Sequence, residues 1–468
     1  MIRYCLLTTT FVISLISSGF CQLLNLPYDP TKEKTTDIQY YKPSHPDLNA
    51  GDPMVYYHNG ELHVYWLLDY KHHEGFKMGG HQWAHMSTKD LINWKHYPLA
   101  LPITMPHELS MCTGSVFYFK DKYYAFYAPR TDLNNDNSPE EHISVAESKD
   151  NITYKKKKPD TLLLRPSDIY DNVSMRDPHV FWDEETKLYY MLVTMAYAQF
   201  DFTNQQGTLA YYTSKDFKNW EFKGEFYTPG YGNGFAIPEC SEVFKWGNWY
   251  YLIFKTSGGN RYRMSKSVTG PWIAPEEDFL GSDYAMVFKS GEFKNNRRIA
   301  VGFIPSRKEN KDDGQWSYAG NLVFREYLQN EDGTLRCVYP QEMIPATGAP
   351  VTLKQLPADK QYFTGDATNF ELNSPYGFAG IKYENIPVDA RITFTITPES
   401  NYIETGVLLR EKDNKYYKVS FSHRSNIVEL GNNTIYDVAG LRNPFEVDII
   451  MKGDIIEMQI AGKRIHTN

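Results

Sequence analysis

Hydrophobic and polar positions follow a pattern that recurs along the first two thirds of this chain. Each copy contains two runs rich in aromatic and β-branched residues, separated by a short polar turn, which predicts a β-hairpin. The copies are Met54–Trp66, Ser115–Tyr127, His179–Leu192, Glu242–Phe254 and a weaker fifth, Met286–Phe303.

A second repeated phrase follows the hairpins. It combines a Ser-Lys or Thr-Lys pair with a nearby aromatic residue, and its copies are Ser87–Trp94, Glu147–Tyr154, Thr213–Trp220 and Met264–Trp272. Radial repetition of antiparallel sheets limits exposed sheet edges in an all-β chain. The two phrases together therefore predict a five-bladed β-propeller over residues 48–345.

After residue 350 the repeat stops and strict alternation of apolar and polar residues begins. It is clear in the segments 391–397, 406–410, 416–422, 445–451 and 455–460. Such alternation over a long segment is typical of a β-sandwich. We therefore expect an all-β protein in which the propeller is followed by a C-terminal β-sandwich over residues 351–468.

The N-terminus has the pattern of a secretory signal. Residues 1–21 contain Arg3, an apolar stretch and then small residues, and residues 22–47 form a polar lead-in to the propeller. This predicts a secreted, periplasmic or cell-surface protein, and Cys21 leaves open a lipid anchor. No later stretch is apolar enough to span a membrane.

Composition excludes some partners. The net charge of −8 argues against nucleic acid, whose binding requires basic patches. Outside the leader the cysteines are Cys112, Cys240 and Cys337, an odd number that indicates no disulfide framework. No Cys and His residues are grouped at zinc spacing, so we expect neither a metal nor a cofactor.

Three carboxylates stand at nearly the same place in the repeat, just before the first run of a hairpin: Asp52, Asp177 and Glu239. Equivalent places on different blades converge at the propeller axis, so we expect these acids to share one pocket. Glycoside hydrolysis needs one carboxylate as nucleophile or base and another as proton donor. Taken singly, an Asp-Pro pair is more often a structural turn, and the argument depends on the recurrence.

Crowding of three acids should raise the pKa of at least one, as a general acid at neutral pH requires. The third acid could stabilise an oxocarbenium-like transition state. Arg176, beside Asp177, either keeps that carboxylate ionised, donates to sugar hydroxyls, or forms an ordinary surface ion pair.

Several motifs resemble glycoside hydrolase family 32, the invertases, inulinases and levanases. They occur in the family's order along the propeller and are Trp83–Leu101, Cys112–Ser115, Arg176–Pro178, Glu239–Cys240 and Trp316–Glu326. The resemblance implies cleavage of β-fructofuranosidic bonds in fructans or other fructose-containing oligosaccharides. It also implies a retaining double displacement with Asp52 as nucleophile, Glu239 as acid/base and Asp177 as transition-state stabiliser. The residues that would line the fructosyl pocket are Trp83, Cys112, Thr113 and Arg176.

The departures from the family pattern lie at its first motif. Gly51 stands where the family has Asn before the nucleophile, and the family's Asn-Gly after the Pro is missing. On the next strand, Leu67 stands where a Gln is common. These losses predict a preference for longer fructans over sucrose. Two other functions remain open: a related arabinan-cleaving furanosidase, and a sugar-binding propeller without catalysis.

Overall fold

The computed structural model describes residues 28–71, 80–105, 108–133, 139–157, 162–163, 165–199, 206–229, 237–256, 259–281, 284–357, 362–399 and 402–468. The predicted signal at residues 1–21, with Cys21, lies outside these ranges, as do residues 22–27 of the lead-in. The chain divides into two compact units, one of residues 1–344 with 462–465 and the other of 345–461 with 466–468. Each is described by itself.

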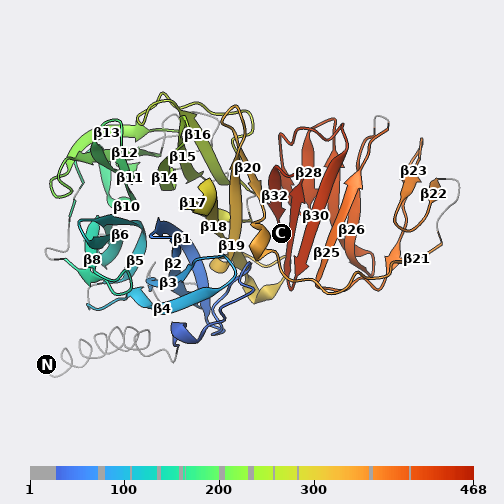
Figure 1. Ribbon diagram of the computed structural model, residues 1–468, viewed down its shortest axis with the longest axis horizontal. Helices are drawn as coiled ribbons and strands as arrows, with labels where there is room; N and C mark the ends of the chain where they lie inside the picture. The colour runs from blue at the N-terminus through green and yellow to red at the C-terminus, as the bar shows by residue number, and fades with distance from the viewer. Residues whose placement is uncertain are drawn as a thin grey trace, which may run out of the picture. The chain divides into compact units, whose positions relative to one another are not determined.

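Strands form almost all of the regular structure (Figure 1). The helices of the described residues are single 3₁₀ turns: η1 (Pro30–Lys32), η3 (Lys294–Asn296), η4 (Lys308–Asn310) and η5 (Gln341–Met343). None of the helices in these ranges is long and apolar enough to cross a membrane. The all-β prediction is therefore confirmed.

Four antiparallel sheets make up the first unit. The largest has the order β17 (Met286–Phe293), β18 (Arg297–Arg307), β19 (Trp316–Gln329), β1 (Leu48–His58), β2 (Glu61–Tyr70), β3 (Gln82–Thr88), β4 (Trp94–Leu101), with β20 (Leu335–Val338) on β19. The next has β5 (Ser110–Phe119), β6 (Lys122–Leu133), β8 (Ser144–Ser148), β9 (Lys155–Lys156), with β7 (Pro139–Glu141) on β6. The other two are β10 (Tyr170–Asp183), β11 (Leu188–Tyr197), β12 (Gly207–Ser214), β13 (Glu221–Tyr227), and β14 (Glu239–Trp246), β15 (Trp249–Thr256), β16 (Gly259–Ser265).

Every predicted hairpin of the repeat forms, namely β1–β2, β5–β6, β10–β11, β14–β15 and β17–β18. The turn of the first hairpin shows why. Asn59 and Gly60 both have positive φ, 50° and 81°, which the tight turn between twisted strands requires and which these residues tolerate.

The repeated phrase begins at the end of a strand and continues into a local turn. In three copies an aspartate accepts hydrogen bonds from the backbone two and three residues ahead. These aspartates are Asp90, Asp150 and Asp216. Asp and Ser favour turns because their side chains satisfy nearby backbone groups.

The first strands of the five hairpins surround a common centre (Figure 1). β1 contacts β5, β5 contacts β10, β10 contacts β14, β14 contacts β17, and β17 contacts β1 again. Residues at the same position on these five strands are therefore brought near one another although they are far apart in sequence. This arrangement positions the predicted acids.

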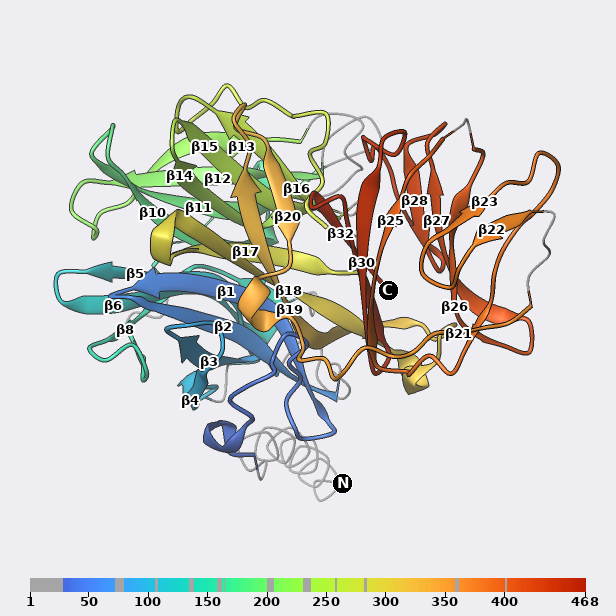
Figure 2. The ribbon, with the colours of Figure 1, turned by 45° about the vertical axis from the view of Figure 1, so that its right-hand side comes forward.

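The second unit contains two four-stranded sheets, visible edge-on in Figure 2. They are β25 (Ala390–Ile396), β30 (Phe445–Lys452), β31 (Ile455–Ile460), β32 (Arg464–Thr467), and β26 (Thr405–Lys412), β27 (Lys415–Ser422), β28 (Ile427–Leu430), β29 (Asn433–Ile435). Phe421 of one sheet packs on Phe445 of the other, with ring centroids 5.2 Å apart. Two short pairs complete the unit: β21 (Lys354–Gln355) with β24 (Tyr383–Glu384), and β22 (Phe363–Gly365) with β23 (Phe370–Leu372).

Candidate active site

A register shift interrupts each of the five central strands, near the beginning of four of them and in the middle of β10. The pairing slips between Gly51 and Pro53, Met111 and Gly114, Arg176 and His179, Glu239 and Glu242, and Met286 and Lys289. β-Bulges of this kind re-aim side chains and are frequent beside active sites. The three predicted acids lie at these shifts, so the same local distortion presents each of them.

We call Asp52, Asp177 and Glu239 the acid cluster. Cys240 connects two of its members, because its backbone N–H donates to Asp177 Oδ2 at 3.0 Å and its thiol lies 3.8 Å from Asp52 Oδ2. Arg176 connects Asp177 to Glu239, with nitrogen to oxygen distances of 4.0 and 2.9 Å. The structure therefore brings together the three acids that the repeat predicted.

The two oxygens of Asp52 have different surroundings. Oδ2 accepts a hydrogen bond of 2.7 Å from the Thr113 hydroxyl. Oδ1 is buried, and no donor among the described residues meets hydrogen-bond geometry with it. One oxygen is thus held in place while the other remains available to a reacting atom.

Asp177 is the most buried acid of the cluster, with 3% of its surface exposed. Its φ of 56° is unusual for a residue other than glycine and is typical of strained functional positions. Burial raises the pKa of Asp177 to about 6; the charge of Arg176 opposes this shift, and the charges of Glu239 and Asp52 add to it. The expected raised pKa therefore falls on Asp177.

Glu239 is the most accessible of the three, with 32% of its side chain exposed. Arg176 Nη2 donates to its Oε1 at 2.9 Å, and Lys255 Nζ lies 3.5 Å from its Oε2. Burial acts to raise the pKa of Glu239, but the two cations outweigh it and the pKa lies below its ordinary value. Glu239 is thus ionised in the substrate-free protein.

Arg176 does not form a simple surface ion pair, because only 14% of its side chain is exposed. Besides the two acids it contacts Glu141 at 3.3 Å, and Glu141 in turn accepts from Arg130 at 2.6 Å. These charges raise the pKa of Arg176 despite its burial. The Arg176 guanidinium is therefore a permanent cation, and Glu141 together with the acids Asp177 and Glu239 fixes its orientation.

Trp83 and Cys112 lie behind the acid cluster. The indole N–H of Trp83 donates to the backbone carbonyl of Cys112 at 3.0 Å, and the ring is fully buried. Cys112 is 6% exposed and Thr113 is 1% exposed. Of the four predicted pocket residues, Thr113 and Arg176 contact the acids directly, whereas Trp83 supports the strand that carries Thr113.

Sequence reasoning missed Lys255, Glu141 and Arg130. Lys255 pairs with Glu239 across the β14–β15 hairpin. Counting outward from its turn, with one residue allowed for the bulge, could have placed Lys255 there. For Glu141 and Arg130 the sequence offered no signal, because both act through Arg176.

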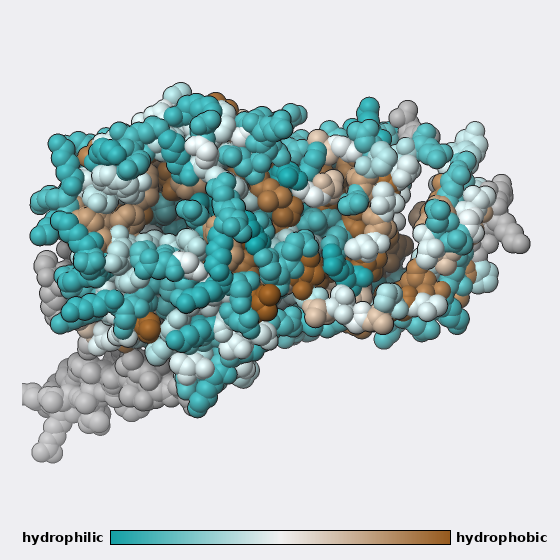
Figure 3. Space-filling model, viewed as in Figure 1, coloured by the Kyte–Doolittle hydropathy of each residue, from teal (hydrophilic) through white to brown (hydrophobic). Residues whose placement is uncertain are grey.

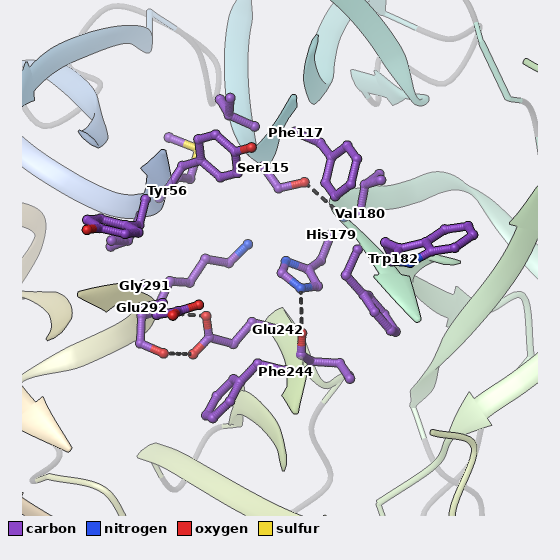
Figure 4. Close-up of a pocket in the computed structure, with 18 of the residues that line it drawn as sticks. Tyr56, Ser115, Phe117, His179, Val180, Trp182, Glu242, Phe244, Gly291 and Glu292 are labelled. Atoms are coloured by element: carbon purple, nitrogen blue, oxygen red, sulfur yellow. Dashed lines mark hydrogen bonds between the residues drawn. The ribbon is translucent and has the colours of Figure 1, made fainter. Parts of the chain in front are cut away.

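A cavity of about 390 Å³ opens further along the same central strands, past the register shifts (Figure 4). None of the three acids lines it. Glu242 accepts from both the N–H and the hydroxyl of Ser290, and His179 contacts the Val243 carbonyl. Figure 3 shows a hollow in the visible face of the first unit, bordered by hydrophobic residues.

Within the described ranges, no three His, Cys, Asp or Glu side chains are grouped so that they could hold a metal ion. The acid cluster itself offers carboxylates, two cations and the Thr113 hydroxyl.

The model of the protein family described as "Glycosyl hydrolases family 32 N-terminal domain" matches residues 42–336, which include the whole acid cluster. The chain belongs to this family.

Among curated relatives, the levanase of Bacillus subtilis is 27% identical over 205 residues, covering 42% of this chain and 27% of the levanase. A sucrose-6-phosphate hydrolase of Escherichia coli is 23% identical over 309 residues, covering 62% and 61%. An extracellular exo-inulinase of Meyerozyma guilliermondii is 25% identical over 237 residues, covering 48% and 43%. The chain thus spans less than two thirds of the length of each.

Solved structures share the fold over nearly the entire chain. A family 32 β-fructofuranosidase of Bombyx mori has a TM-score of 0.67 at 16% identity and covers 97% of this chain and 92% of its own. The exo-inulinase of Aspergillus awamori has a TM-score of 0.67 at 16% identity and covers 94% and 93%. At these identities the similarity establishes the fold.

Proposed function

We propose that this protein is a retaining glycoside hydrolase that cleaves β-fructofuranosidic bonds in fructans such as levan and inulin, or in fructo-oligosaccharides. The observation that carries the proposal is the acid cluster: three carboxylates on three of the five central strands, each with different charged and hydrogen-bonding neighbours. Family membership and relatives named levanase and exo-inulinase support the substrate class.

Asp52 acts as the nucleophile. Its unpaired Oδ1 attacks the anomeric carbon of the fructosyl unit while Thr113 holds Oδ2. The bond to the leaving oxygen breaks, Glu239 gives that oxygen a proton, and a fructosyl ester forms on Asp52. Water, deprotonated by Glu239, then cleaves the ester, which restores the Asp52 carboxylate and the protonated Glu239.

Glu239 must hold a proton for the first step, although its pKa is low in the free protein. The Glu239 side chain is about one third exposed, so a substrate bound beside it excludes water from the carboxylate. Exclusion of water strengthens the burial effect, which favours the neutral acid over the charged form. Binding of substrate and protonation of Glu239 are therefore coupled.

Asp177 stabilises the transition state. Its negative charge is costly in the resting protein, as its pKa of about 6 indicates. A positive charge that develops on the fructosyl ring lowers this cost, so the interaction is stronger in the transition state than in the ground state.

The proposal extends to the architecture and the location. Each of the five central strands contacts the next in a closed ring, which supports a five-bladed propeller as the catalytic domain, over residues 48–345. The two four-stranded sheets that follow support a β-sandwich over residues 351–468. Residues 1–21 act as an export signal, so the substrate is met outside the cytoplasm.

The test is release of fructose by the purified protein from levan, inulin and sucrose. We expect release with β-fructofuranose as the first anomer seen by NMR, and loss of nearly all turnover in Asp52→Asn and Glu239→Gln. The double variant should be little worse than either single one. Asp216→Asn, which changes an exposed turn, is the control and should retain activity.

Two results would contradict the proposal. Cleavage of arabinan instead of fructan would indicate the related furanosidase activity. Binding of fructan without any cleavage, at every pH tried, would indicate a sugar-binding propeller.

A further inference from the structure

The side chain of Tyr318 fills the space beside Gly51, the residue that precedes the candidate nucleophile Asp52. A Cβ atom added at Gly51 would lie 2.4 Å from the Tyr318 hydroxyl oxygen and 2.7 and 2.8 Å from two of its ring carbons. Real Cβ atoms essentially never approach other atoms within 3.0 Å. Tyr318 therefore occupies the volume that any side chain at position 51 would need.

Strand pairing explains how Tyr318 reaches this place from far along the chain. β19 pairs antiparallel with β1 through Ala50 and Gly320. Two residues forward from Ala50 is Asp52, and two residues back from Gly320 is Tyr318. This pairing brings Tyr318 beside Asp52, whose carboxylate is one of the charges that act on the Tyr318 hydroxyl.

The two positions that lack the family's amide side chains face each other across one hairpin, since Gly51 lies opposite Leu67 in the β1–β2 pairing. Two residues beyond Leu67 on β2 is the fully buried Asp69. Both amide side chains of the family pattern are thus missing at one spot, and that spot adjoins Tyr318.

A buried ion pair supports the tyrosine ring. His81, 4% exposed, packs on Tyr318 with ring centroids 5.1 Å apart, and its Nε2 lies 3.3 Å from Asp69 Oδ1. Burial acts to lower the pKa of His81, but Asp69 and then Cys112 raise it to about 9, so the ring is charged at neutral pH. Burial and the charges of Asp52 and Asp69 raise the pKa of Tyr318, so its hydroxyl keeps its proton.

We propose that Tyr318, supported by the His81–Asp69 pair, is a positioning residue that orients the Asp52 carboxylate and borders the fructosyl unit where the family's amides are absent at positions 51 and 67. The effect on catalysis rests on the proposed function, whereas the steric relation between Gly51 and Tyr318 does not.

The steric part is tested by thermal unfolding of Gly51→Ala, Tyr318→Ala and the double variant. Gly51→Ala should lower the melting temperature because the new methyl group collides with the tyrosine ring. In the Tyr318→Ala background the same change should have little or no effect, since residues in contact give non-additive effects. Additive effects would overturn the steric claim whether or not the protein is an enzyme.

The positioning part is tested with Tyr318→Phe, which removes only the hydroxyl. We expect kcat on a fructan to fall about ten- to hundredfold, because the hydroxyl acts on the charged Asp52 carboxylate, while KM changes less than about twofold. Tyr327→Phe is the matched control, because Tyr327 is a fully buried tyrosine on the same strand. It should leave both constants unchanged.

The outcomes are distinct. Unchanged kcat in Tyr318→Phe, with an active wild type, would overturn the positioning role. A loss confined to melting temperature, or an equal loss in Tyr327→Phe, would indicate a structural role only. If the wild type cleaves no fructan, the proposed function fails, and the unfolding experiment still decides the steric claim.

Discussion

Asp177→Asn should abolish activity and yet make the protein more stable at neutral pH. The pKa of Asp177 is about 6 in the folded protein, against 3.8 for an unperturbed aspartate. The folded state therefore keeps this proton over a pH range in which the unfolded chain has lost it. Stability falls as pH rises from 3.8 through 6, and the full cost is present above that range.

The size of the effect follows from the shift. About two pKa units correspond to about 3 kcal/mol at neutral pH, as an order of magnitude. Because Asp177 is 3% exposed, solvent does not screen this cost. Asparagine resembles the protonated acid and can still accept from the Cys240 N–H, so the variant should recover most of this free energy.

The assay is the melting temperature of both proteins between pH 4 and 8. We expect Asp177→Asn to melt higher at pH 7, with a difference that shrinks towards zero as pH falls to 4. Asp183→Asn on the same strand is the control. Asp183 is also 3% exposed, but it accepts from Thr186 and Tyr250, and its pKa is lowered in spite of its burial. Its loss should destabilise the protein at pH 7. A variant at position 177 no more stable than wild type at pH 7, or a pH-independent difference, would refute the reasoning.

Three further predictions concern the surroundings of the acid cluster. Arg176→Lys should lower kcat/KM at least about tenfold, because lysine cannot contact Glu239 and the other acids in the same fork geometry, and steady-state kinetics on levan measures this. The charged form of His81 contributes stability that is complete below pH 6.5 and is lost as pH rises through about 9, so His81→Gln should flatten the decline of melting temperature over that window. The groups that face the His81 ring are Asp69, Cys112 and Tyr318, and they are the same in the wild type and in His81→Gln. The amides common in the family are absent at positions 51 and 67, and one tyrosine hydroxyl offers fewer hydrogen bonds than two amides. We therefore expect kcat/KM to be higher for a fructan series of rising length than for sucrose, and equal or higher values for sucrose would mean that the lost amide contacts are fully replaced.

The local pattern of the sequence was enough to predict the hairpins and the convergence of the three acids. Hairpin formation depends on neighbouring residues, such as Asn59 and Gly60, and a repeat carries that information several times. The position of the acids follows from the repeat, because equivalent residues must lie at equivalent places around a common centre.

The electrostatics of the cluster could not be predicted in the same way. The raised pKa falls on Asp177 instead of on Glu239, the expected proton donor, because Arg176 and Lys255 both lie against Glu239. That difference depends on side-chain directions created by the bulges. Nothing in the spacing of the sequence specifies which way a bulge directs its residue.

Tyr318 shows the limit most clearly. It lies in a motif that the sequence comparison recognised, and its contact with position 51 depends on the pairing of β19 with β1, strands separated by most of the first unit. The absence of amide side chains at Gly51 and Leu67 was visible in the sequence. The residue that fills the space was not, because only tertiary pairing brings it there.

The central claim is that Asp52 forms a covalent bond to the fructosyl unit. The most direct measurement is mass spectrometry of peptides from protein that is quenched with acid during turnover of levan. We predict one fructosyl unit on the peptide that contains Asp52, and none in Asp52→Asn. Rapid turnover with an unmodified Asp52 peptide, or with the unit attached to Asp177 or Glu239, would contradict the account.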